Sequence, residues 1–142
     1  MSQHIVSTAD EMRSVAQTFG ASLHAGDVVI LAGPLGAGKT TFTQGLASGL
    51  KVRGPITSPT FVISRVHPSL VGGPSLIHVD AYRVESLDEI DDLDFDSDLN
   101  HSVLVAEWGH GKVDAVVQAT YIVTIERADD DVRTVQIAKV SA

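Results

Sequence analysis

The residues with the clearest chemical signature form the glycine-rich run Gly33 to Thr40, with the letters GPLGAGKT. The run matches the pattern G-x-x-x-x-G-K-[ST] in full, and this pattern is typical of loops that surround phosphate groups. Its glycines allow backbone N–H groups to turn inward toward an anion. Lys39 can reach the outer phosphates as a mobile cation, and the Thr40 hydroxyl can bind Mg²⁺. The run therefore predicts a phosphate-binding loop, and Mg-ATP is the expected ligand.

The sequence on either side of this loop supports the same interpretation. Residues 28–32 form a continuous apolar run, which is typical of a strand buried on both faces of a parallel sheet. Residues 41–50 continue as a helix, whose N-terminus adds a positive dipole end at the loop. A chance glycine-rich turn is disfavoured because a strand precedes the loop and a helix follows it. The predicted nucleotide-binding residues of the loop are Gly33, Leu35, Gly36, Ala37, Gly38, Lys39, Thr40 and Thr41.

Two acidic residues stand at the ends of predicted strands. Asp80 follows residues 76–79, and Glu107 follows residues 103–106. Ligands of open α/β sheets bind at the carboxyl ends of the strands. P-loop enzymes use one acid there to hold Mg²⁺ or its water shell, and often a second to orient the attacking water. The spacing leaves open which acid has which role, and whether either one caps a turn instead. With Lys39, these acids are the candidate catalytic residues.

Four further features have both a functional and a structural interpretation. Trp108 can form a wall of the nucleotide site, contact a partner or belong to the core. The segment 57–61, which contains Thr60, lies where many P-loop enzymes carry a switch, but its hydroxyls can equally stabilise a turn. Arg83 can contact phosphate or a partner, or pair with nearby acids. The acidic run 85–98 is either a solvated face or a docking surface for a basic partner. The histidines without metal-ligand spacing, which receive no role, are His67, His78, His101 and His110.

The elements that must position these residues alternate between helix and strand. Capping residues and helical spacing predict a helix from about Thr8 to Leu23, and a short helix opens at Ser86. The remaining predicted strands are 61–66, 76–79, 103–106, 121–126 and 132–139. The last two form a hairpin around residues 129–131, which we expect at the edge of the sheet. The predicted fold is α/β, of the P-loop NTPase type, with a mixed central sheet flanked by helices and a C-terminal antiparallel hairpin.

Length and composition limit the possible classes of protein. The 142 residues, 44% of them hydrophobic, suit one domain spanning residues 1–142. A formal net charge of −8 disfavours autonomous binding of nucleic acid, so any link to RNA is expected through a partner protein. The absence of cysteine excludes disulfides and thiolate chemistry. There is neither a signal peptide nor an apolar run long enough to cross a bilayer, and we expect a soluble, cytoplasmic protein.

Four motifs in order resemble the bacterial TsaE family over nearly the whole chain. They are the loop at 33–41, Thr-Ser-Pro-Thr-Phe at 57–61, His-x-Asp-x-Tyr-Arg at 78–83 and Glu-Trp at 107–108. The resemblance implies a Mg-dependent ATPase that is required for making threonylcarbamoyladenosine in tRNAs. It also implies that the ATPase acts on a complex of TsaD and TsaB, is weak alone, and meets tRNA only through that complex.

The resemblance also implies roles for single residues. Lys39 and Thr40 would hold phosphate and Mg²⁺. Glu107 resembles the magnesium-linked acid of the family and Asp80 the acid needed for hydrolysis. The other residues that match family positions near the nucleotide are Thr8, Thr60, Trp108 and Arg133. The chain departs from the family at Gly109, where many members have proline, and in the dense charge of residues 91–98.

Two other P-loop classes are alternatives to this interpretation. A small-molecule kinase usually needs a lid of arginines, whereas the arginines of this chain are scattered. A GTPase switch needs an Asn-Lys-x-Asp motif to read guanine, and the sequence contains none. The kinase remains the main alternative.

Overall fold

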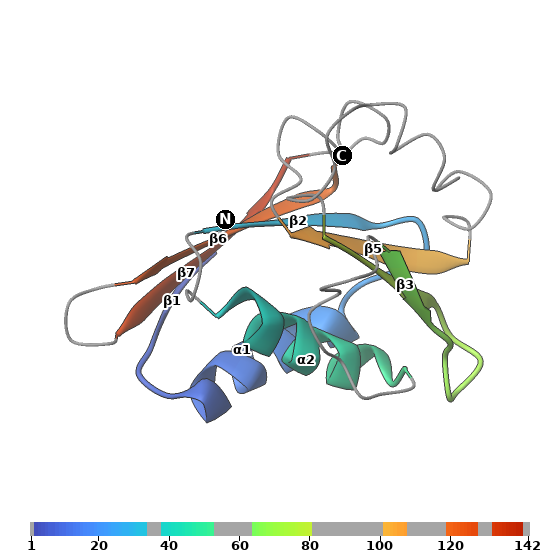
Figure 1. The fold of residues 1–142 in the computed structure, drawn as a ribbon, viewed down its shortest axis with the longest axis horizontal. Helices are drawn as coiled ribbons and strands as arrows, with labels where there is room; N and C mark the ends of the chain where they lie inside the picture. The colour runs from blue at the N-terminus through green and yellow to red at the C-terminus, as the bar shows by residue number, and fades with distance from the viewer. Residues whose placement is uncertain are drawn as a thin grey trace.

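In the part of the chain that the structure describes, a mixed sheet of seven strands carries two helices on one face (Figure 1). The structure is a computed structural model. It describes residues 2–33, 38–52, 64–80, 101–107, 119–127 and 132–140, and for Ser64, Arg65 and Asp80 it describes the backbone alone. The helices are α1 (Ala9–Ala21) and α2 (Lys39–Leu50). The strands are β1 (Ser2–Val6), β2 (Val28–Ala32), β3 (Ser64–His67), β4 (Ser75–Asp80), β5 (Ser102–Glu107), β6 (Tyr121–Arg127) and β7 (Arg133–Lys139).

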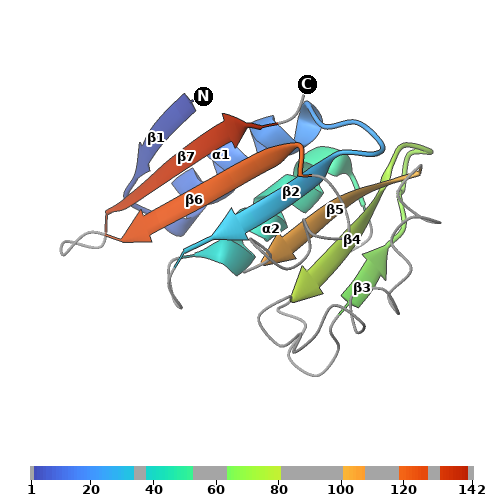
Figure 2. The ribbon, with the colours of Figure 1, turned by 90° about the horizontal axis from the view of Figure 1, so that it is seen from above.

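The strand order β1-β7-β6-β2-β5-β4-β3 places a parallel block in the middle of the sheet (Figure 2). β2 pairs in parallel with both β5 and β6, and β4 pairs in parallel with β5. Antiparallel strands complete the two sides, with β7 and β1 beyond β6 and β3 beyond β4. The predicted mixed α/β sheet with a C-terminal hairpin is therefore confirmed.

The position of the hairpin differs from the prediction. β6 pairs with the central strand β2, and β1 pairs with the outer side of β7, so the hairpin lies inside the sheet. The prediction was wrong because it missed β1, a strand of five mostly exposed residues. Such a short segment, in which Val6 alone is buried, has little pattern of its own, and it becomes a strand by pairing with β7.

The central strands are buried on both faces, as their apolar runs predict. Val28 through Leu31 of β2 are fully buried, as are Val103 through Ala106 of β5. The residues that alternate toward the helices, among them Leu31 and Val105, join a core with Phe42 and Leu46 of α2. This burial fixes the strands as a rigid frame for the residues at their carboxyl ends.

Glycines allow the two helices to pack with their backbones almost in contact. A Cβ atom added to Gly45 or Gly49 of α2 would overlap the carbonyl oxygens of Arg13 and Gln17 in α1. In return, a Cβ atom on Gly20 of α1 would overlap the carbonyl oxygen of Leu46. Gly45 and Gly49 are four residues apart and so lie on the same face of α2. Only glycine permits this approach, which fixes α1 relative to α2.

The helix boundaries agree closely with the sequence. Thr8 is the N-cap of α1, where the Glu11 N–H donates to Thr8 Oγ1 at 3.1 Å. In return, the Ser7 N–H donates to Glu11 Oε1 at 3.1 Å, which completes a reciprocal cap. α2 begins at Lys39, two residues before the predicted start. The short helix expected at Ser86 and the expected turn at 129–131 lie outside the described residues.

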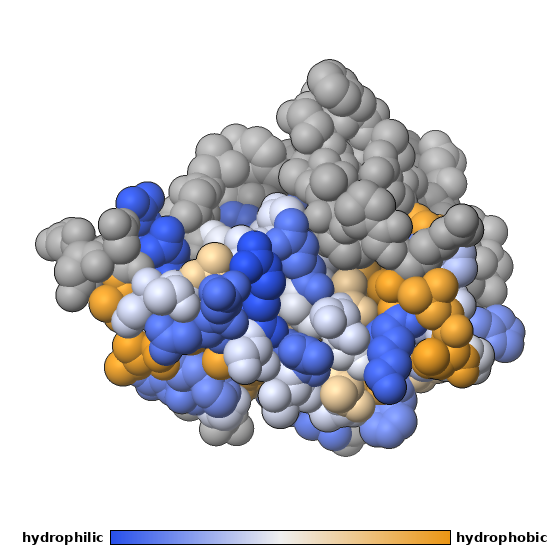
Figure 3. Space-filling view, turned by 90° about the horizontal axis from the view of Figure 1, so that it is seen from below, coloured by the Kyte–Doolittle hydropathy of each residue, from blue (hydrophilic) through white to orange (hydrophobic). Residues whose placement is uncertain are grey.

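The surface on the helix side is mostly polar over the middle of the molecule, and apolar groups gather at two sides of the view (Figure 3). Among the described residues, the exposed large apolar side chains are Ile5, Val66, Leu70, Val71 and Val140. Of the helices that the structure describes, none is long and apolar enough to cross a membrane.

Candidate functional site

The carboxyl ends of three parallel strands meet at the start of the glycine-rich loop. Glu107, the last residue of β5, is the register partner of Leu31 in β2 on one side and of Asp80 in β4 on the other. Gly33 follows β2 directly and opens the loop. Both acids therefore end their strands beside the loop, at the edge where open α/β sheets bind ligands.

Lys39 lies across the base of the loop. It is the first residue of α2, its side chain is only 7% exposed, and its Nζ donates to the carbonyl oxygen of Gly33 at 2.8 Å. This hydrogen bond joins the two described ends of the loop, and it holds a buried cation against a neutral acceptor. A phosphate oxygen is a stronger acceptor for an ammonium group than a carbonyl oxygen is. The geometry therefore suits an anion at the mouth of the loop.

Gly38 turns the chain from the loop into α2. Its φ of 108° lies in the left-handed region, which side chains other than that of glycine rarely adopt. It is the N-cap of α2 but has no side chain to accept from the first N–H groups of the helix, and the first turn carries no acidic residue. The N–H groups of a first helical turn that has neither a capping side chain nor a nearby negative charge can bind an anion. The start of α2 can thus bind phosphate through its backbone.

Thr40 and Glu107 form the second part of the site. The Thr40 hydroxyl donates to Glu107 Oε1 at 3.4 Å, and Glu107 is only 4% exposed. A buried carboxylate needs a cation or strong hydrogen bonds, and the contact with Thr40 is long. Hydroxyl and carboxylate oxygens are the ligands that Mg²⁺ prefers. The pair can therefore hold a small divalent cation at the start of α2.

The described part of the chain contains no group of three or more histidine and carboxylate residues that could hold a metal. Mg²⁺ is usually held by one or two protein side chains together with phosphates and water, and needs no such group. Thr40 and Glu107 as the two protein ligands agree with this usual coordination of Mg²⁺.

A pocket with a volume of about 230 Å³ is lined in part by Gly38. Four predicted nucleotide-binding residues meet there from three parts of the chain. They are Thr8 at the start of α1, Gly38 and Thr41 around the start of α2, and Arg133 at the start of β7. A pocket next to a phosphate loop is suited to the base or sugar of a nucleotide.

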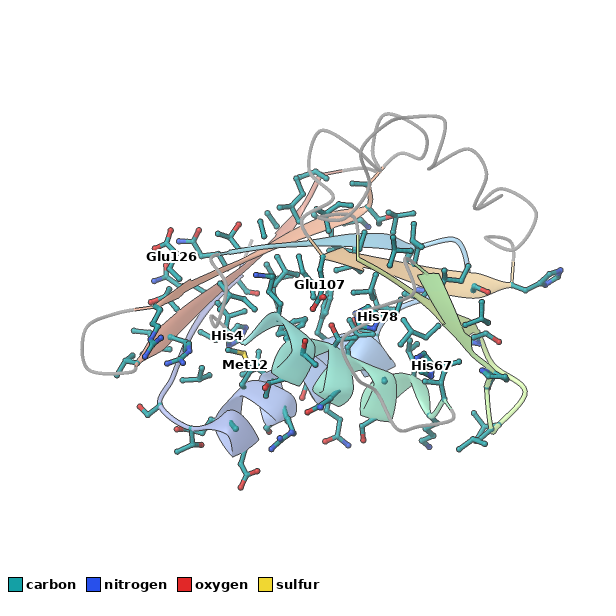
Figure 4. All side chains as sticks on the ribbon, viewed as in Figure 1. His4, Met12, His67, His78, Glu107 and Glu126 are labelled. Atoms are coloured by element: carbon teal, nitrogen blue, oxygen red, sulfur yellow. The ribbon has the colours of Figure 1, made fainter. Side chains whose placement is uncertain are left out.

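The pocket also contains a residue that the sequence did not predict. Met12 lines it and is almost fully buried, one turn into α1 (Figure 4). A Cβ atom on Gly38 would come within 3.3 Å of Met12 Cε, so the methionine packs against the end of the loop. Because Met12 also follows the helical core pattern, its sequence position could not separate the two roles.

His78 is a second residue that sequence reasoning missed. The motif spacing gave it no role, yet its ring is fully buried and its Nε2 lies 3.7 Å from Glu107 Oε2 (Figure 4). A signal existed in the sequence, because His78 precedes Asp80 by two residues on one strand and alternate residues share a face.

Several predicted residues fall outside the described part of the chain. These are Leu35, Gly36, Ala37, Thr60, Arg83 and Trp108, together with segment 57–61 and the acidic run 85–98. For Asp80, the structure gives the backbone position beside Glu107.

The chain was compared with known families and structures. The sequence model of the family "Threonylcarbamoyl adenosine biosynthesis protein TsaE" matches residues 6–135. A protein of Streptomyces coelicolor named "tRNA threonylcarbamoyladenosine biosynthesis protein TsaE" is 55% identical over 121 residues, which cover 84% of this chain and 82% of that protein. Proteins with the same name are 45% identical in Mycobacterium tuberculosis, over 83% of this chain and 74% of theirs, and 38% identical in Bacillus subtilis, over 92% and 81%.

A similar solved structure is the crystal structure of Bacillus subtilis YdiB. It superimposes with a TM-score of 0.73 at 32% sequence identity, covering 99% of this chain and 86% of that one. The fold assigned above therefore agrees with an experimental structure over almost the full length.

Proposed function

The chain belongs to the TsaE family of threonylcarbamoyl adenosine biosynthesis proteins, and we propose that it binds and hydrolyses Mg-ATP in support of threonylcarbamoyladenosine modification of tRNA. The observation that carries this proposal is the contact between Thr40 and Glu107 beside Lys39, at the base of a complete phosphate-loop sequence. The Thr40 hydroxyl and the buried Glu107 carboxylate are in contact, and the neighbouring Lys39 contacts Gly33 at the start of the loop.

Phosphate binding uses the loop and the start of α2. Backbone N–H groups at Gly38 and beyond receive the phosphate oxygens, and Lys39 exchanges the carbonyl oxygen of Gly33 for a phosphate oxygen. The Lys39 Nζ already lies beside Gly33, the first residue of the loop. The stronger acceptor favours the exchange.

Thr40 and Glu107 hold the magnesium ion of the nucleotide in this proposal. Thr40 Oγ1 and Glu107 Oε1 lie 3.4 Å apart, and Glu107 is buried, so two oxygen ligands are available to one small cation. Bound Mg²⁺ neutralises charge on the outer phosphates. The chain's own part is to hold the Glu107 carboxylate beside Thr40 at the start of α2. Asp80, beside Glu107 in register, is proposed to orient the attacking water.

The pocket lined by Thr8, Met12 and Arg133 receives the base and sugar. Met12 offers an apolar, polarisable surface for an aromatic base, and Arg133 offers donors at the rim. We assign ATP as the nucleotide because the chain lacks a guanine-reading motif.

We further propose that hydrolysis serves the TsaD–TsaB complex in the cytoplasm and that tRNA is met only through that complex. A net charge of −8 supports an indirect route to tRNA, since binding of nucleic acid needs clustered basic residues. We expect slow hydrolysis by the isolated chain, because groups supplied by a partner can accelerate phosphoryl transfer by orders of magnitude.

Phosphate release from ATP and GTP tests this function. The chain is assayed alone and with TsaD and TsaB, beside Lys39→Ala and the control Lys139→Ala, which removes an exposed lysine of β7. Support would be ATP-selective release that rises with the partners, disappears in Lys39→Ala and persists in the control. If TsaD and TsaB have no effect on turnover, but a small phosphoryl acceptor causes turnover, the chain would instead be a small-molecule kinase.

A further inference from the structure

A buried histidine lies against the carboxylate proposed to hold magnesium, and the function above gives it no task. The His78 ring is fully buried, Glu107 is 4% exposed, and Nε2 lies 3.7 Å from Oε2. The inference below rests on the proposed function, since it concerns the orientation of Glu107 toward a bound cation.

The sheet register makes the two residues neighbours. β4 and β5 are parallel, with His78 opposite Val105 and Asp80 opposite Glu107. Side chains two residues apart on a strand share a face, so His78 and Glu107 point diagonally toward each other on the helix face. Both side chains lie between the sheet and α2 (Figure 4). Neither can turn away to solvent from this position.

The two ring nitrogen atoms of His78 are buried polar atoms, which are costly to leave without a hydrogen bond. Among the described residues neither ring nitrogen makes a hydrogen bond. The same face of the sheet contributes Leu76, Val103 and Val105 to the apolar core. An aliphatic side chain would fill this space without the penalty of buried, unpaired nitrogen atoms. The histidine therefore fits a polar task, and Glu107 is the acceptor next to it.

The two oxygens of Glu107 have different neighbours. Oε1 lies 3.4 Å from the Thr40 hydroxyl at the mouth of the loop, and Oε2 lies 3.7 Å from His78 Nε2 in the interior. A donor on Oε2 fixes the rotation of the carboxylate and leaves Oε1 facing the loop. Partners that orient a ligating side chain in this way commonly govern metal affinity.

We propose that His78 is a positioning residue for Glu107. In the Nε2–H tautomer it donates to Oε2, and binding of Mg-nucleotide shortens this contact by roughly half an ångström to hydrogen-bonding distance. His78 thereby holds Oε1 toward Thr40 and the cation. It contacts neither nucleotide nor metal itself.

Two nearly isosteric variants test this role. His78→Gln keeps an N–H donor near the position of Nε2, whereas His78→Met fills similar space without one. Binding of a fluorescent ADP analogue is measured in EDTA and across a Mg²⁺ titration. We expect His78→Met to raise the Mg²⁺ concentration that gives half of the maximal gain in ADP-analogue binding by about tenfold or more. For His78→Gln this Mg²⁺ concentration should be close to that of the parent chain. Binding in EDTA should stay the same in all variants.

A matched control is His67→Met on the neighbouring strand β3. His67 is also buried, but it lies in the register position opposite Leu76, away from the acids at the strand ends. Its replacement should leave the Mg²⁺ dependence unchanged. A His78→Met variant that matches the parent in the Mg²⁺ titration overturns the proposal. A variant that weakens binding equally in EDTA also overturns it, because that result indicates a structural role.

A measurement on the unmutated chain tests the proposal without requiring that the His78 variants fold. Nitrogen-15 spectra of the histidine rings should report the Nε2–H tautomer for His78, with its Nε2 signal shifting when Mg-ADP is added. A Nδ1–H tautomer would overturn the proposal. Failure of the proposed function has a different result, in which the parent chain binds the ADP analogue with no gain from Mg²⁺ or does not bind it at all.

Discussion

The hydroxyl of Thr40 donates to Glu107 Oε1 at 3.4 Å and joins the first turn of α2 to the end of β5, across 67 residues of sequence. The contact brings an oxygen atom from α2 and an oxygen atom from β5 together beside the glycine-rich loop. It is longer than an ordinary O–H···O hydrogen bond of about 2.7 Å, so the two groups are close without satisfying each other. That arrangement leaves the carboxylate available to a cation.

Glu107→Gln tests the carboxylate itself. The amide keeps the shape of the side chain but removes the charge, so Mg²⁺-dependent nucleotide binding should weaken by more than about tenfold, the size of effect that residues behind the ligands already have. Thermal unfolding without ligand should occur at the same or a higher temperature, because a buried charge has been removed. Fluorescence titration and a melting curve measure the two effects. Unchanged Mg²⁺ dependence would remove Glu107 from the metal site.

Gly49→Ala tests the close packing of the helices. Alanine favours an exposed helix over glycine by about 1 kcal/mol. Here the added Cβ meets the backbone of Gln17, and we expect a net loss of about 1–3 kcal/mol in the free energy of unfolding. Urea denaturation measures the difference. The control is Gly73→Ala, where the Cβ would be no closer than 3.8 Å to other atoms, and its stability should not fall. A Gly49→Ala chain more stable than the parent would contradict the packing.

The parts of the fold that the sequence predicts are those with a strong local pattern. The apolar run at 28–32 predicts β2, and the helix expected after the glycine run is α2. The place of the hairpin depends on which strands pair, and β1 has too little pattern to reveal that it covers β7. Pairing between distant strands is set by the whole core rather than by any one segment.

The residues of the candidate site differ in the same way in how far the sequence predicts them. A motif predicts Lys39 and Thr40, and their positions after strands predict Asp80 and Glu107. The pairing of His78 with Glu107 depends on the register of β4 against β5, which no local spacing contains. Similarly, Thr8 and Arg133 share a pocket because β7 runs antiparallel to β1, which leads into α1.

Arg133→Ala tests the rim of that pocket. Loss of the guanidinium should weaken nucleotide binding by about tenfold, corresponding to about 1.4 kcal/mol. The neighbouring Arg127 is the matched control, since it is the register partner of Arg133 in the hairpin but does not line the pocket. Equilibrium binding of the ADP analogue to both alanine variants decides the question. Equal losses in the two variants would indicate a general effect of charge.

Thr8→Asp separates the capping role of Thr8 from its place in the pocket. Aspartate accepts hydrogen bonds from the first N–H groups of a helix as well as threonine does, so the stability of α1 should be kept. Its charge would, however, lie beside the pocket at Gly38 and repel the phosphates of a nucleotide. We expect unfolding in urea to match that of Thr8→Ser, which caps without charge, while nucleotide binding weakens several-fold and recovers partly at high salt. If Thr8→Asp bound nucleotide as tightly as Thr8→Ser at low salt, the pocket would not lie next to the phosphates.

A lower free energy of unfolding for Thr8→Asp than for Thr8→Ser would mean that the cap depends on more than an acceptor oxygen at residue 8.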